Sequence, residues 1–416
     1  MNSEIHPKIF IYNPTCEIAI ANGTVSYMPN KMLSRFEKDL DVLPMYFADE
    51  KDVVLVNQLP DQELRTVMQE AGISLPEFKL FESSIQDKEF VNSAKESLEP
   101  WGWSPRIHHI FKHLKDSCQE EFKNRPNAEW QADHKNLYSR KKALEVLNFF
   151  LDRTNDPFYI EKEQIATICT TVAEIEELIN QWKQIVIKAP WSSSGRGLQV
   201  LRQSHLNDSI IQWINGTLDI QGYVMVEPLL DKKHDFSLQY HINTYGEVNY
   251  MGNGFFATNS NGQYDSNILG GMPTAMKEFL SDEKMQQLAE YMKEAMISCG
   301  IAQNYSGYLG IDCMLYRDKS GEMKLQPCLE INLRYNMGTL ALIFDEHLHP
   351  ETKGVFKVHF KPKSTFDQFH KEMVKNHPLK WKDGKWFEGY LPLVSFSQNK
   401  VFGAYLLLEN TNQEIK

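Results

Sequence analysis

Short apolar runs and amphipathic stretches alternate through the first part of the chain. Residues 8–12 and 53–56 are continuous apolar runs that predict buried strands, and the stretch 60–72 has the spacing of a helix. Asn13-Pro14 ends the first run with residues that favour a turn. The order strand, helix, strand, helix is typical of a small parallel α/β unit, which we expect at the N-terminus.

The middle of the chain continues the alternation with longer helical patterns. Thr171 stands at the start of an apolar stripe and is expected to cap a helix over 172–182. The polar segment 124–137 predicts a linker or an exposed loop. Further helices are predicted over 106–123, 139–152 and 207–218, and strands over 158–160, 184–189, 198–201 and 223–226.

Alternation with period two dominates the second half. It runs through 234–257 and predicts an antiparallel meander with one polar side. A helix over 282–298 then leads to a strand pair, 306–317 and 323–334, joined by a turn at 318–321. From about residue 350 onward the pattern predicts no particular structure.

Composition and charge exclude several classes of protein. The 416 residues are enough for two or three domains, and 42% hydrophobic with 24% charged residues is ordinary for a globular chain. The formal net charge of -11 argues against nucleic-acid binding through a broad basic surface. It does not exclude a nucleotide ligand, because a local group of cations can override the global field.

Cysteine usage and hydropathy favour a cytoplasmic protein. The six cysteines form no C-x-x-C pair, and several lie in apolar runs where a buried thiol is expected. A reducing compartment therefore fits better than secretion. The N-terminal residues show no signal-peptide pattern, and no run approaches the ~18 apolar residues of a membrane span.

The strongest chemical pattern lies in the strand pair. Glu330, Asn332 and Arg334 alternate with apolar residues and so project from one face of a strand. The turn at 318–321 places Asp312 roughly opposite Glu330, where two like charges would repel. A divalent cation removes that repulsion, so Asp312, Glu330 and Asn332 are predicted metal ligands. A solvated face with chance carboxylates is the alternative, which the apolar character of both strands disfavours.

A second pattern joins an apolar strand to a polar loop. Lys188 ends the strand, and a buried lysine is costly unless its ammonium meets an anion. The loop that follows contains hydroxyls and glycines that can turn N–H and O–H groups toward phosphate oxygens. A hairpin turn with a snorkelling lysine explains this segment equally well. The loop residues are Ser192, Ser193, Ser194, Gly195, Arg196 and Gly197.

Two weaker patterns accompany these. The strand 223–226 runs into Glu227-Pro228-Leu229-Leu230, and Asp235 follows shortly afterwards. The cluster 139–142 places cations at a predicted helix start, where they oppose the helix dipole unless an anion lies nearby. Each of these is equally compatible with a plain strand end or a solvated basic turn.

In this order, the four segments together resemble the ATP-grasp family, over roughly residues 135–340. The resemblance implies an α/β fold, α+β in the grasp part, with a small parallel α/β domain followed by a two-lobed ATP-grasp domain. It places the N-terminal domain at 1–130, the small lobe with its glycine loop at 131–222, and the large lobe with the metal site and a C-terminal extension at 223–416.

The resemblance also implies roles for single residues. Lys141 and Lys188 would hold the nucleotide phosphates, with Lys142 a near-equal candidate for the first, and the loop 192–197 would cover them. Asp312, Glu330 and Asn332 match the family's magnesium ligands, and Arg334 matches an arginine that steadies the transferred group, so Arg334 and Lys188 are the catalytic candidates. Glu227, Leu229 and Leu230 correspond to the adenine-binding hinge and Asp235 to the ribose contact. Pro228, which offers no N–H, and a loop with only Gly195 and Gly197 depart from the pattern.

The implied activity is that of an ATP- and Mg²⁺-dependent ligase. It would activate a substrate carboxylate as an acyl phosphate and join it to an amine, with an amino acid or peptide on at least one side, using one or two Mg²⁺ ions for which Mn²⁺ can substitute. A small-molecule kinase on the same fold and a nucleotide-binding protein without turnover are the alternatives, and the intact metal set argues against the second. The expected partners are a small-molecule or peptide substrate, with no nucleic acid and no membrane, and a homodimer is a compatible assembly.

The acceptor pocket is the least determined part of the site. Asn13, Cys16 and Glu17 follow the first strand, and ligands of parallel α/β units bind at the carboxyl ends of strands. The segments 253–271 and 335–338 flank the predicted metal site and are further candidates for its lining. For Trp101 and Trp103, structural packing is the favoured interpretation.

Overall fold

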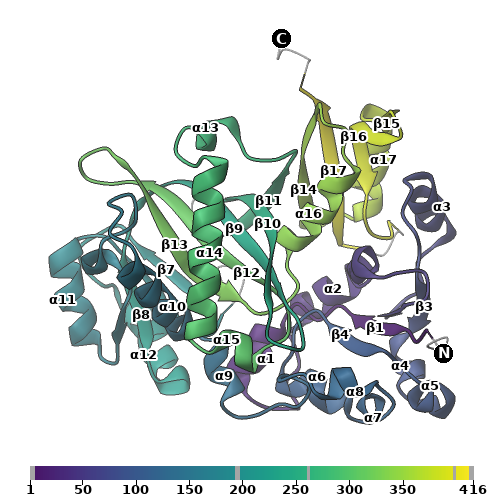
Figure 1. The fold of residues 1–416 in the computed structure, drawn as a ribbon, viewed down its shortest axis with the longest axis horizontal. Helices are drawn as coiled ribbons and strands as arrows, with labels where there is room; N and C mark the ends of the chain where they lie inside the picture. The colour runs from purple at the N-terminus through teal and green to yellow at the C-terminus, as the bar shows by residue number, and fades with distance from the viewer. Residues whose placement is uncertain (1–4, 193–196, 260–262, 397–399, 412–416) are drawn as a thin grey trace.

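The protein contains three β-sheets in the part of the chain that the structure describes (Figure 1). The structure is a computed structural model and describes residues 5–192, 197–259, 263–396 and 400–411. One sheet is parallel and belongs to the N-terminal region, one is small and antiparallel, and one is a large antiparallel sheet of nine strands.

The N-terminal sheet has the order β3-β2-β1-β4, and its described pairings are all parallel. This confirms the small parallel α/β unit that the sequence predicts. The strands are β1 (Lys8–Ile11), β2 (Val53–Val56), β3 (Glu77–Leu80) and β4 (Ser97–Pro100). The helices are α1 (Cys16–Asn22), α2 (Lys31–Asp39), α3 (Gln62–Glu70), α4 (Phe81–Ser84) and α5 (Lys88–Asn92), with a 3-10 helix η1 (Leu43–Phe47).

The single helix predicted over 106–123 is wrong. The segment forms α6 (Pro105–Ile110), α7 (Lys112–Lys115) and α8 (Glu120–Lys123). Between α7 and α8 the backbone pairs with Lys95, whose N–H donates to Ser117 O at 2.9 Å and whose carbonyl accepts from Gln119 N at 2.9 Å. An extended segment held by two long-range hydrogen bonds cannot continue a helix.

The small antiparallel sheet has the order β5-β8-β6-β7. Its strands are β5 (Thr167–Cys169), β6 (Ile185–Lys188), β7 (Leu198–Leu201) and β8 (Val224–Pro228), with α11 (Val172–Trp182) and α12 (Asp208–Gln221) beside them. The Thr171 cap is confirmed, because its hydroxyl accepts from Glu174 N and the Glu174 carboxylate accepts from Thr171 N.

The large sheet has the order β13-β12-β9-β10-β11-β14-β17-β16-β15. Its last four strands come from the C-terminal segment for which the sequence predicted nothing, and they join the meander because β14 pairs with β11. The strands are β9 (Asp231–Ile242), β10 (Val248–Thr258), β11 (Tyr264–Leu269), β12 (Gly307–Arg317), β13 (Met323–Asn332), β14 (Thr352–Phe360), β15 (Lys380–Lys382), β16 (Lys385–Pro392) and β17 (Phe402–Asn410).

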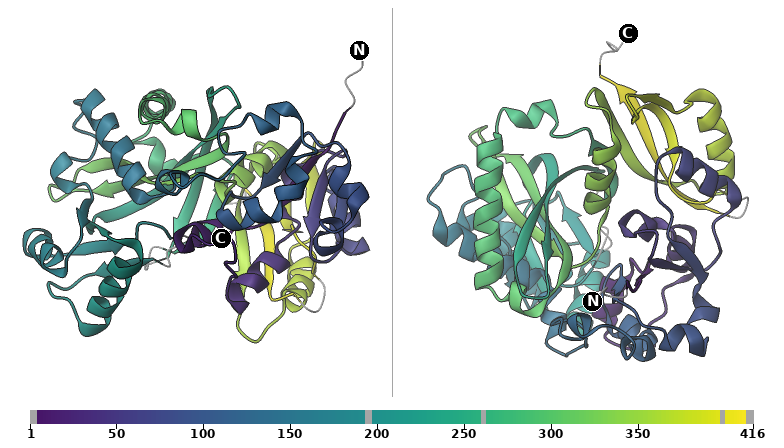
Figure 2. Two further views of the ribbon diagram at one scale, coloured as in Figure 1. Left: turned by 90° about the horizontal axis from the view of Figure 1, so that it is seen from below. Right: turned by 45° about the vertical axis from the view of Figure 1, so that its right-hand side comes forward.

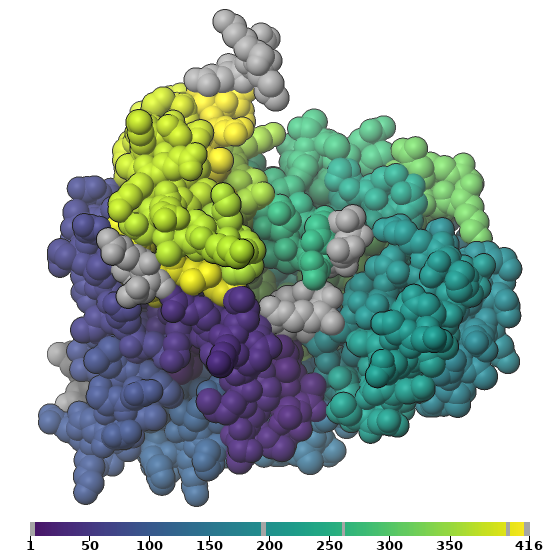
Figure 3. All heavy atoms as spheres, turned by 180° about the vertical axis from the view of Figure 1, so that it is seen from behind, coloured from purple at the N-terminus to yellow at the C-terminus, as the bar shows by residue number. Residues whose placement is uncertain are grey.

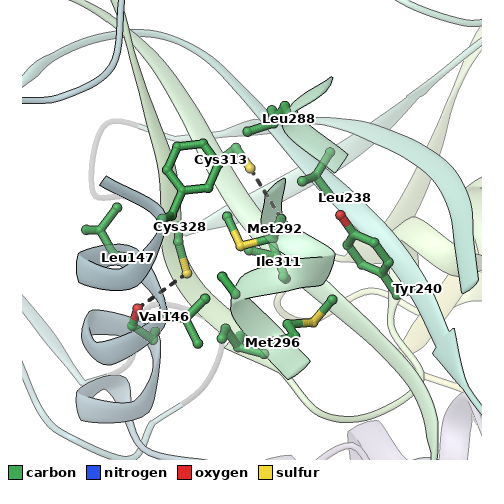
Figure 4. Packing of buried hydrophobic residues seen from close by; sticks show 14 of the residues in the cluster. Val146, Leu147, Leu238, Tyr240, Leu288, Met292, Met296, Ile311, Cys313 and Cys328 are labelled. Carbon is green, nitrogen blue, oxygen red and sulfur yellow. Dashed lines mark hydrogen bonds between the residues drawn. The ribbon is translucent and has the colours of Figure 1, made fainter. Parts of the chain in front are cut away.

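Helices cover the large sheet on both faces. Helices α10 (Arg140–Arg153) and α14 (Asp282–Ser298) bury one apolar face, and α16 (Met337–His347) packs on the other. Figure 4 shows side chains of both helices meeting those of the strands in the apolar layer: Val146, Leu147, Leu288, Met292 and Met296 against Leu238, Tyr240, Ile311, Cys313 and Cys328. The remaining helices are α9 (His134–Leu137), η2 (Lys162–Gln164), α13 (Thr274–Lys277), α15 (Ile301–Asn304) and α17 (Phe366–Asn376).

The predicted domain division at 130 and 222 remains a prediction. Buried side chains between 137 and 160 pack in the core of the large sheet, and β8, beyond residue 222, pairs with the small sheet. The strand predicted over 158–160 is reduced to a single bridge between Tyr159 and Leu325. Within the described residues, no helix has the length and apolar character needed to cross a membrane.

The N-terminal unit packs against the C-terminal strands of the large sheet (Figures 2 and 3). The Asp39 carboxylate accepts from Phe402 N at 3.0 Å, and Lys400 Nζ donates to the Asp39 carbonyl at 3.1 Å. The Tyr46 hydroxyl donates to Leu393 O at 2.9 Å. These contacts join α2 and η1 to the C-terminal segment that carries β17.

Candidate active site

The polar face of the large sheet carries the predicted metal ligands. Asp312 of β12 and Glu330 of β13 are direct cross-strand partners, as the sequence predicts, and Asn332 lies opposite Gly310. Asn332 Nδ2 donates to Asp312 Oδ2 at 3.2 Å. Burial, and next the charge of Glu330, raise the pKa of Asp312 to about 7. Two carboxyl groups and an amide therefore converge where a cation would relieve their repulsion.

Arg334 lies beside this group and is held by the N-terminal unit. Its Nε donates to Glu17 Oε1 at 3.0 Å and its Nη2 to Glu17 Oε2 at 3.4 Å, so that a carboxylate from α1 grips the guanidinium with both oxygens. Nη2 also donates to Asn332 Oδ1 at 2.9 Å. Burial disfavours the cation, but the charge of Glu17 outweighs it and the pKa of Arg334 is raised. Asn332 thus joins the arginine to the carboxylate pair.

Arg140, the first residue of α10, connects three parts of the site. Its Nη1 donates to Ala189 O at 2.6 Å and to Ser192 Oγ at 2.6 Å, and its Nη2 donates to Glu330 Oε1 at 2.8 Å. The side chain is buried, with 7% of its surface exposed. Ser139 caps the helix by accepting from Lys142 N, which fixes the direction in which the first turn points.

Lys141 and Lys142 lie outside this network. Lys141 is exposed, and Lys142 Nζ donates to Glu145 Oε2 at 2.7 Å and to Cys299 O at 3.2 Å. Successive residues of a helix point about 100° apart, so only one of the three cations can face the sheet. The structure places Arg140 there and leaves Lys141 exposed, and the phosphate-binding role expected of Lys141 stays a prediction.

Lys188 ends β6 next to Glu227 of the neighbouring strand β8. Lys188 Nζ lies 2.5 Å from Glu227 Oε1, and both side chains are largely shielded from solvent. They border a narrow cavity of about 20 Å³ that also reaches Arg140. Its other lining residues are Leu144, Leu147, Ala166, Met225, Gln326, Cys328 and Leu329. Arg140 therefore links the cavity to the metal face.

The remaining predicted adenine and ribose contacts, Leu229, Leu230 and Asp235, do not line this cavity. Leu229 N already donates to Gln184 O at 2.9 Å, and neither Leu229 nor Leu230 is among the residues that line the cavity. The Asp235 carboxylate accepts from Lys232 Nζ at 2.7 Å and from Thr258 Oγ1 at 2.7 Å. Asp235 also raises the pKa of Asp312, which fits a position on the same sheet face.

The glycine loop is described only at its ends. Ala189 N donates to Gly197 O at 2.8 Å, which closes the connection between β6 and β7, and Ser192 contacts Arg140. Ser193, Ser194, Gly195 and Arg196 lie outside the described residues. The predicted roles of these four residues stay predictions.

Helix α16 approaches the polar sheet face closely. A side chain at Gly338 would lie 2.5 Å from Gln239 Nε2, so any larger residue would force the Gln239 amide to move. Asn336 Nδ2 and Thr339 Oγ1 donate to Gln239 Oε1 at 2.9 and 3.0 Å. The segment 335–338 therefore packs and forms hydrogen bonds at the edge of the site. Trp101 and Trp103 are buried among aromatic side chains, as the packing interpretation predicts.

The donor set fits magnesium. Among the described residues, no group of three or more histidine, cysteine, aspartate or glutamate side chains is arranged to hold a metal. Asp312 and Glu330 with the Asn332 amide are two carboxylates and a neutral oxygen, and Mg²⁺ commonly takes one or two carboxylates and completes its shell with water and phosphate oxygens.

Sequence reasoning missed two residues of the network. Arg140 belongs to the basic cluster 139–142, and the Ser139 cap was the signal that the residue directly after it, rather than the next, faces inward. Glu17 was expected near the acceptor pocket, but no local pattern pairs it with Arg334, 317 positions away.

Comparisons with known proteins support the fold. No family model matches the sequence, and no curated protein matches it. The biotin carboxylase–β-γ-ATP complex from Campylobacter jejuni is similar to this chain with a TM-score of 0.51 at 11% identity, covering 99% of this chain and 89% of that one. The biotin carboxylase domain of the 2-oxoglutarate carboxylase from Hydrogenobacter thermophilus gives 0.50 at 12% identity, covering 98% and 87%.

An L-amino acid ligase from Bacillus licheniformis is also similar, with a TM-score of 0.49 at 12% identity, covering 99% of this chain and 95% of that one. At such identities the likeness to the two carboxylase structures establishes the fold alone. The chain has the ATP-grasp fold that its sequence predicts, with a mixed α/β architecture, a small parallel sheet and a large antiparallel sheet.

Proposed function

We propose that this protein is an ATP- and Mg²⁺-dependent ligase that activates a carboxylate as an acyl phosphate and joins it to an amine. The observation that carries the proposal is the convergence on one sheet face of two acidic side chains, an amide and two arginines, next to a cavity lined by a third cation. Both carboxylase structures with this fold are complexes with adenine nucleotides, one of them with magnesium. This supports the same ligand class here.

Lys188 and Arg140 are the cations that we assign to the nucleotide phosphates. Each is mostly buried and each is now paired with a carboxylate, Lys188 with Glu227 and Arg140 with Glu330. A buried cation retains a partner at all times, since an unpaired charge would be costly. Phosphate oxygens would offer both cations more negative charge than a single carboxylate does.

Asp312, Glu330 and Asn332 would hold the metal ion. Bound Mg²⁺ supplies neutralisation of phosphate oxygens and makes the terminal phosphoryl group a better electrophile. The chain contributes by holding the two carboxylates in register across the β12–β13 pair. Their positions are fixed by strand pairing rather than by loops, which keeps the donors preorganised.

The reaction would proceed in two displacements that need no side-chain nucleophile. A carboxylate oxygen of the substrate attacks the γ-phosphorus, the new O–P bond forms, and the bond to the ADP oxygen breaks. The amine nitrogen then attacks the acyl carbon and a C–N bond forms. The bond between the acyl carbon and the phosphate oxygen breaks, phosphate leaves, and the nitrogen loses a proton. Arg334, held by Glu17, is placed to balance the negative charge in both steps.

Trapping the acyl phosphate tests the proposal. The protein is incubated with ATP, Mg²⁺ and each of the standard amino acids or simple dipeptides, with and without hydroxylamine. A ligase yields ADP, phosphate and a hydroxamate with the correct carboxylate. A stable phosphorylated product without free phosphate would identify a kinase, and magnesium-dependent ATP binding without ADP formation would identify a binding protein. Either result would overturn the ligase assignment.

A further inference from the structure

The hydroxyl of Tyr12 is buried without a hydrogen-bond partner among the described residues. Tyr12 follows β1 and exposes 4% of its surface, and its oxygen is shielded from solvent. A buried hydroxyl without a partner destabilises the fold, so such a group calls for an explanation. Glu37, Arg334, Tyr264 and Cys16 act electrostatically on it, so charged and polar groups of both the N-terminal unit and the large sheet lie near the hydroxyl.

Glu37 of α2 is the carboxylate next to this hydroxyl. Its side chain is 13% exposed, and its Oε1 accepts from Thr15 Oγ1 at 2.5 Å. Burial raises the pKa of Glu37, while Thr15 and Arg106 oppose that shift. The hydroxyl and the N–H of Thr15, with one cation at 4.0 Å, leave part of the acceptor capacity of this carboxylate unused by the described residues.

Arg106 of α6 is the cation next to Glu37. Its Nη1 lies 4.0 Å from Glu37 Oε2, at the limit of an ion pair, and the side chain is 24% exposed. Its guanidinium makes no hydrogen bond to any described residue, although it carries five N–H donors. A mostly shielded guanidinium of this kind is suited to bind a planar anion such as a carboxylate.

The three groups lie where ligands of parallel α/β units bind. Tyr12 comes directly after β1, and Arg106 follows β4, its neighbour in the sheet, so that both leave the same edge. The carboxyl ends of parallel strands form the ligand crevice in such folds. Arg334 of the metal face is one of the groups that act on Tyr12, so this edge of the parallel sheet lies beside the proposed reaction centre.

We propose that Tyr12, Glu37 and Arg106 form the recognition site for a free α-amino acid, which serves as one substrate of the proposed ligase. Its ammonium lies against Glu37, its α-carboxylate against the Arg106 guanidinium, and the Tyr12 hydroxyl donates to that carboxylate. An α-amino acid carries its two charges on either side of one carbon atom, which matches an acidic and a basic side chain held close together but not hydrogen-bonded to each other. The inference rests on the proposed function but concerns binding alone.

Calorimetry with the full chain tests the site. The twenty standard amino acids are titrated with and without Mg²⁺ and the ATP analogue AMP-PNP, and the best binder is then compared with its N-acetyl and its carboxamide derivatives. Each derivative removes one charge and is expected to bind about 10-fold more weakly. If no standard amino acid binds under either condition, the inference is overturned.

Charge-specific variants identify the two contacts. Arg106→Gln is expected to lower the affinity for the amino acid about 10-fold and to leave the affinity for its carboxamide unchanged. Glu37→Gln is likewise expected to lower the affinity for the amino acid and to leave the affinity for the N-acetyl derivative unchanged. Arg35→Gln on α2, which loses a pair with Asp39 at 2.8 Å, is the matched control and is expected to bind like the wild type. Wild-type affinity in both Arg106→Gln and Glu37→Gln would contradict the proposal.

Tyr12→Phe separates recognition from structure. Because the hydroxyl has no described partner, its removal is expected to leave the melting temperature unchanged or higher, while amino-acid affinity falls about 5-fold. A lower melting temperature with unchanged affinity would assign the hydroxyl to the fold and overturn its role. AMP-PNP binding is measured on the same samples. If AMP-PNP binds and amino acids do not, this inference fails alone; if AMP-PNP does not bind, the proposed function fails.

Discussion

The two sides of the proposed reaction centre hold their charges in different ways. On the large sheet, Arg334 donates to Glu17, Asn332 and Tyr335 O, so its guanidinium is fixed from several directions. On the N-terminal side, Arg106 has one ion pair at 4.0 Å and no hydrogen bond within the described part of the chain. Both arginines lie beside a carboxylate, but only the Arg334 guanidinium is held by several hydrogen bonds.

The difference suits the two arginines to different tasks. Charges that must act on a developing transition state work best when they are fixed beforehand, because no reorganisation is needed during the reaction. A charge that recognises a ligand gains from keeping its donors available until the ligand binds. Under the proposed function, the large sheet would supply the catalytic surface, and the edge of the N-terminal sheet the recognition surface.

The largest effect is expected at the metal face. Glu330→Gln removes one charge from the facing carboxylates, and we expect turnover to fall by about 1,000-fold while AMP-PNP affinity changes less than about 10-fold. Single-turnover kinetics and calorimetry measure the two quantities. Glu322→Gln, at an exposed position near the turn of the same strand pair, is the control. Normal turnover in Glu330→Gln would show that the metal site lies elsewhere.

The next effect distinguishes the cations at the start of α10. Arg140→Ala and Lys188→Ala are each expected to weaken AMP-PNP binding by about 10- to 100-fold, because each removes a charged hydrogen-bond donor from the cavity. Lys141→Ala, which alters an exposed side chain, is expected to change the affinity less than about 2-fold. If Lys141→Ala has the larger effect, the helix presents a different face when nucleotide is bound and the assignment to Arg140 is wrong.

Glu17→Gln probes how firmly Arg334 is held. It leaves the buried Arg334 cation with neutral hydrogen-bond partners, Tyr335 O and Asn332 Oδ1, so we expect the free energy of unfolding to fall by about 3 kcal/mol and kcat by about 10-fold, with KM for ATP unchanged. Urea unfolding and steady-state kinetics measure these. Glu37→Gln is the counterpart on the N-terminal side and is expected to cost less than about 1 kcal/mol, because burial already disfavours the Glu37 charge and its ion pair with Arg106 is long, at 4.0 Å. Equal destabilisation by both variants would remove the distinction between the two sides.

The smallest effect concerns Asp345 on α16, whose carboxyl forms no ion pair with a described residue. Burial raises the pKa of Asp345 to about 6, although Gly270 N donates to it at 2.8 Å. The folded protein then binds this proton more readily than the unfolded chain does, so this group makes stability fall as the pH rises from about 4 to about 6.

Asp345→Asn is expected to raise the free energy of unfolding by about 1 to 2 kcal/mol above pH ~6, and by less near pH ~4. It also removes a negative charge from the C-terminal turn of α16, where the helix dipole disfavours it. Urea unfolding at the two pH values, with the exposed neighbour Glu346→Gln as control, measures the difference. A gain that does not depend on pH would mean that the Asp345 carboxyl titrates normally.

The sequence by itself determined the elements whose pattern is local. The helix over 282–298 and the strands 53–56 and 198–201 have the predicted bounds, and Thr171 caps its helix as expected. The pairing of Asp312 with Glu330 followed from a short hairpin. In each case the deciding contacts lie within one turn or one hairpin, so the residues near each position are sufficient to predict them.

Only the tertiary structure decided which distant groups meet. It joined the C-terminal strands to the large sheet through β14 and β11, broke the segment 106–123 where the backbone pairs with Lys95, turned Arg140 inward in place of Lys141, and paired Glu17 with Arg334. These outcomes depend on contacts between segments far apart in the chain, which no periodicity encodes. A pattern of alternation tells which face of an element is polar, and packing alone decides what that face meets.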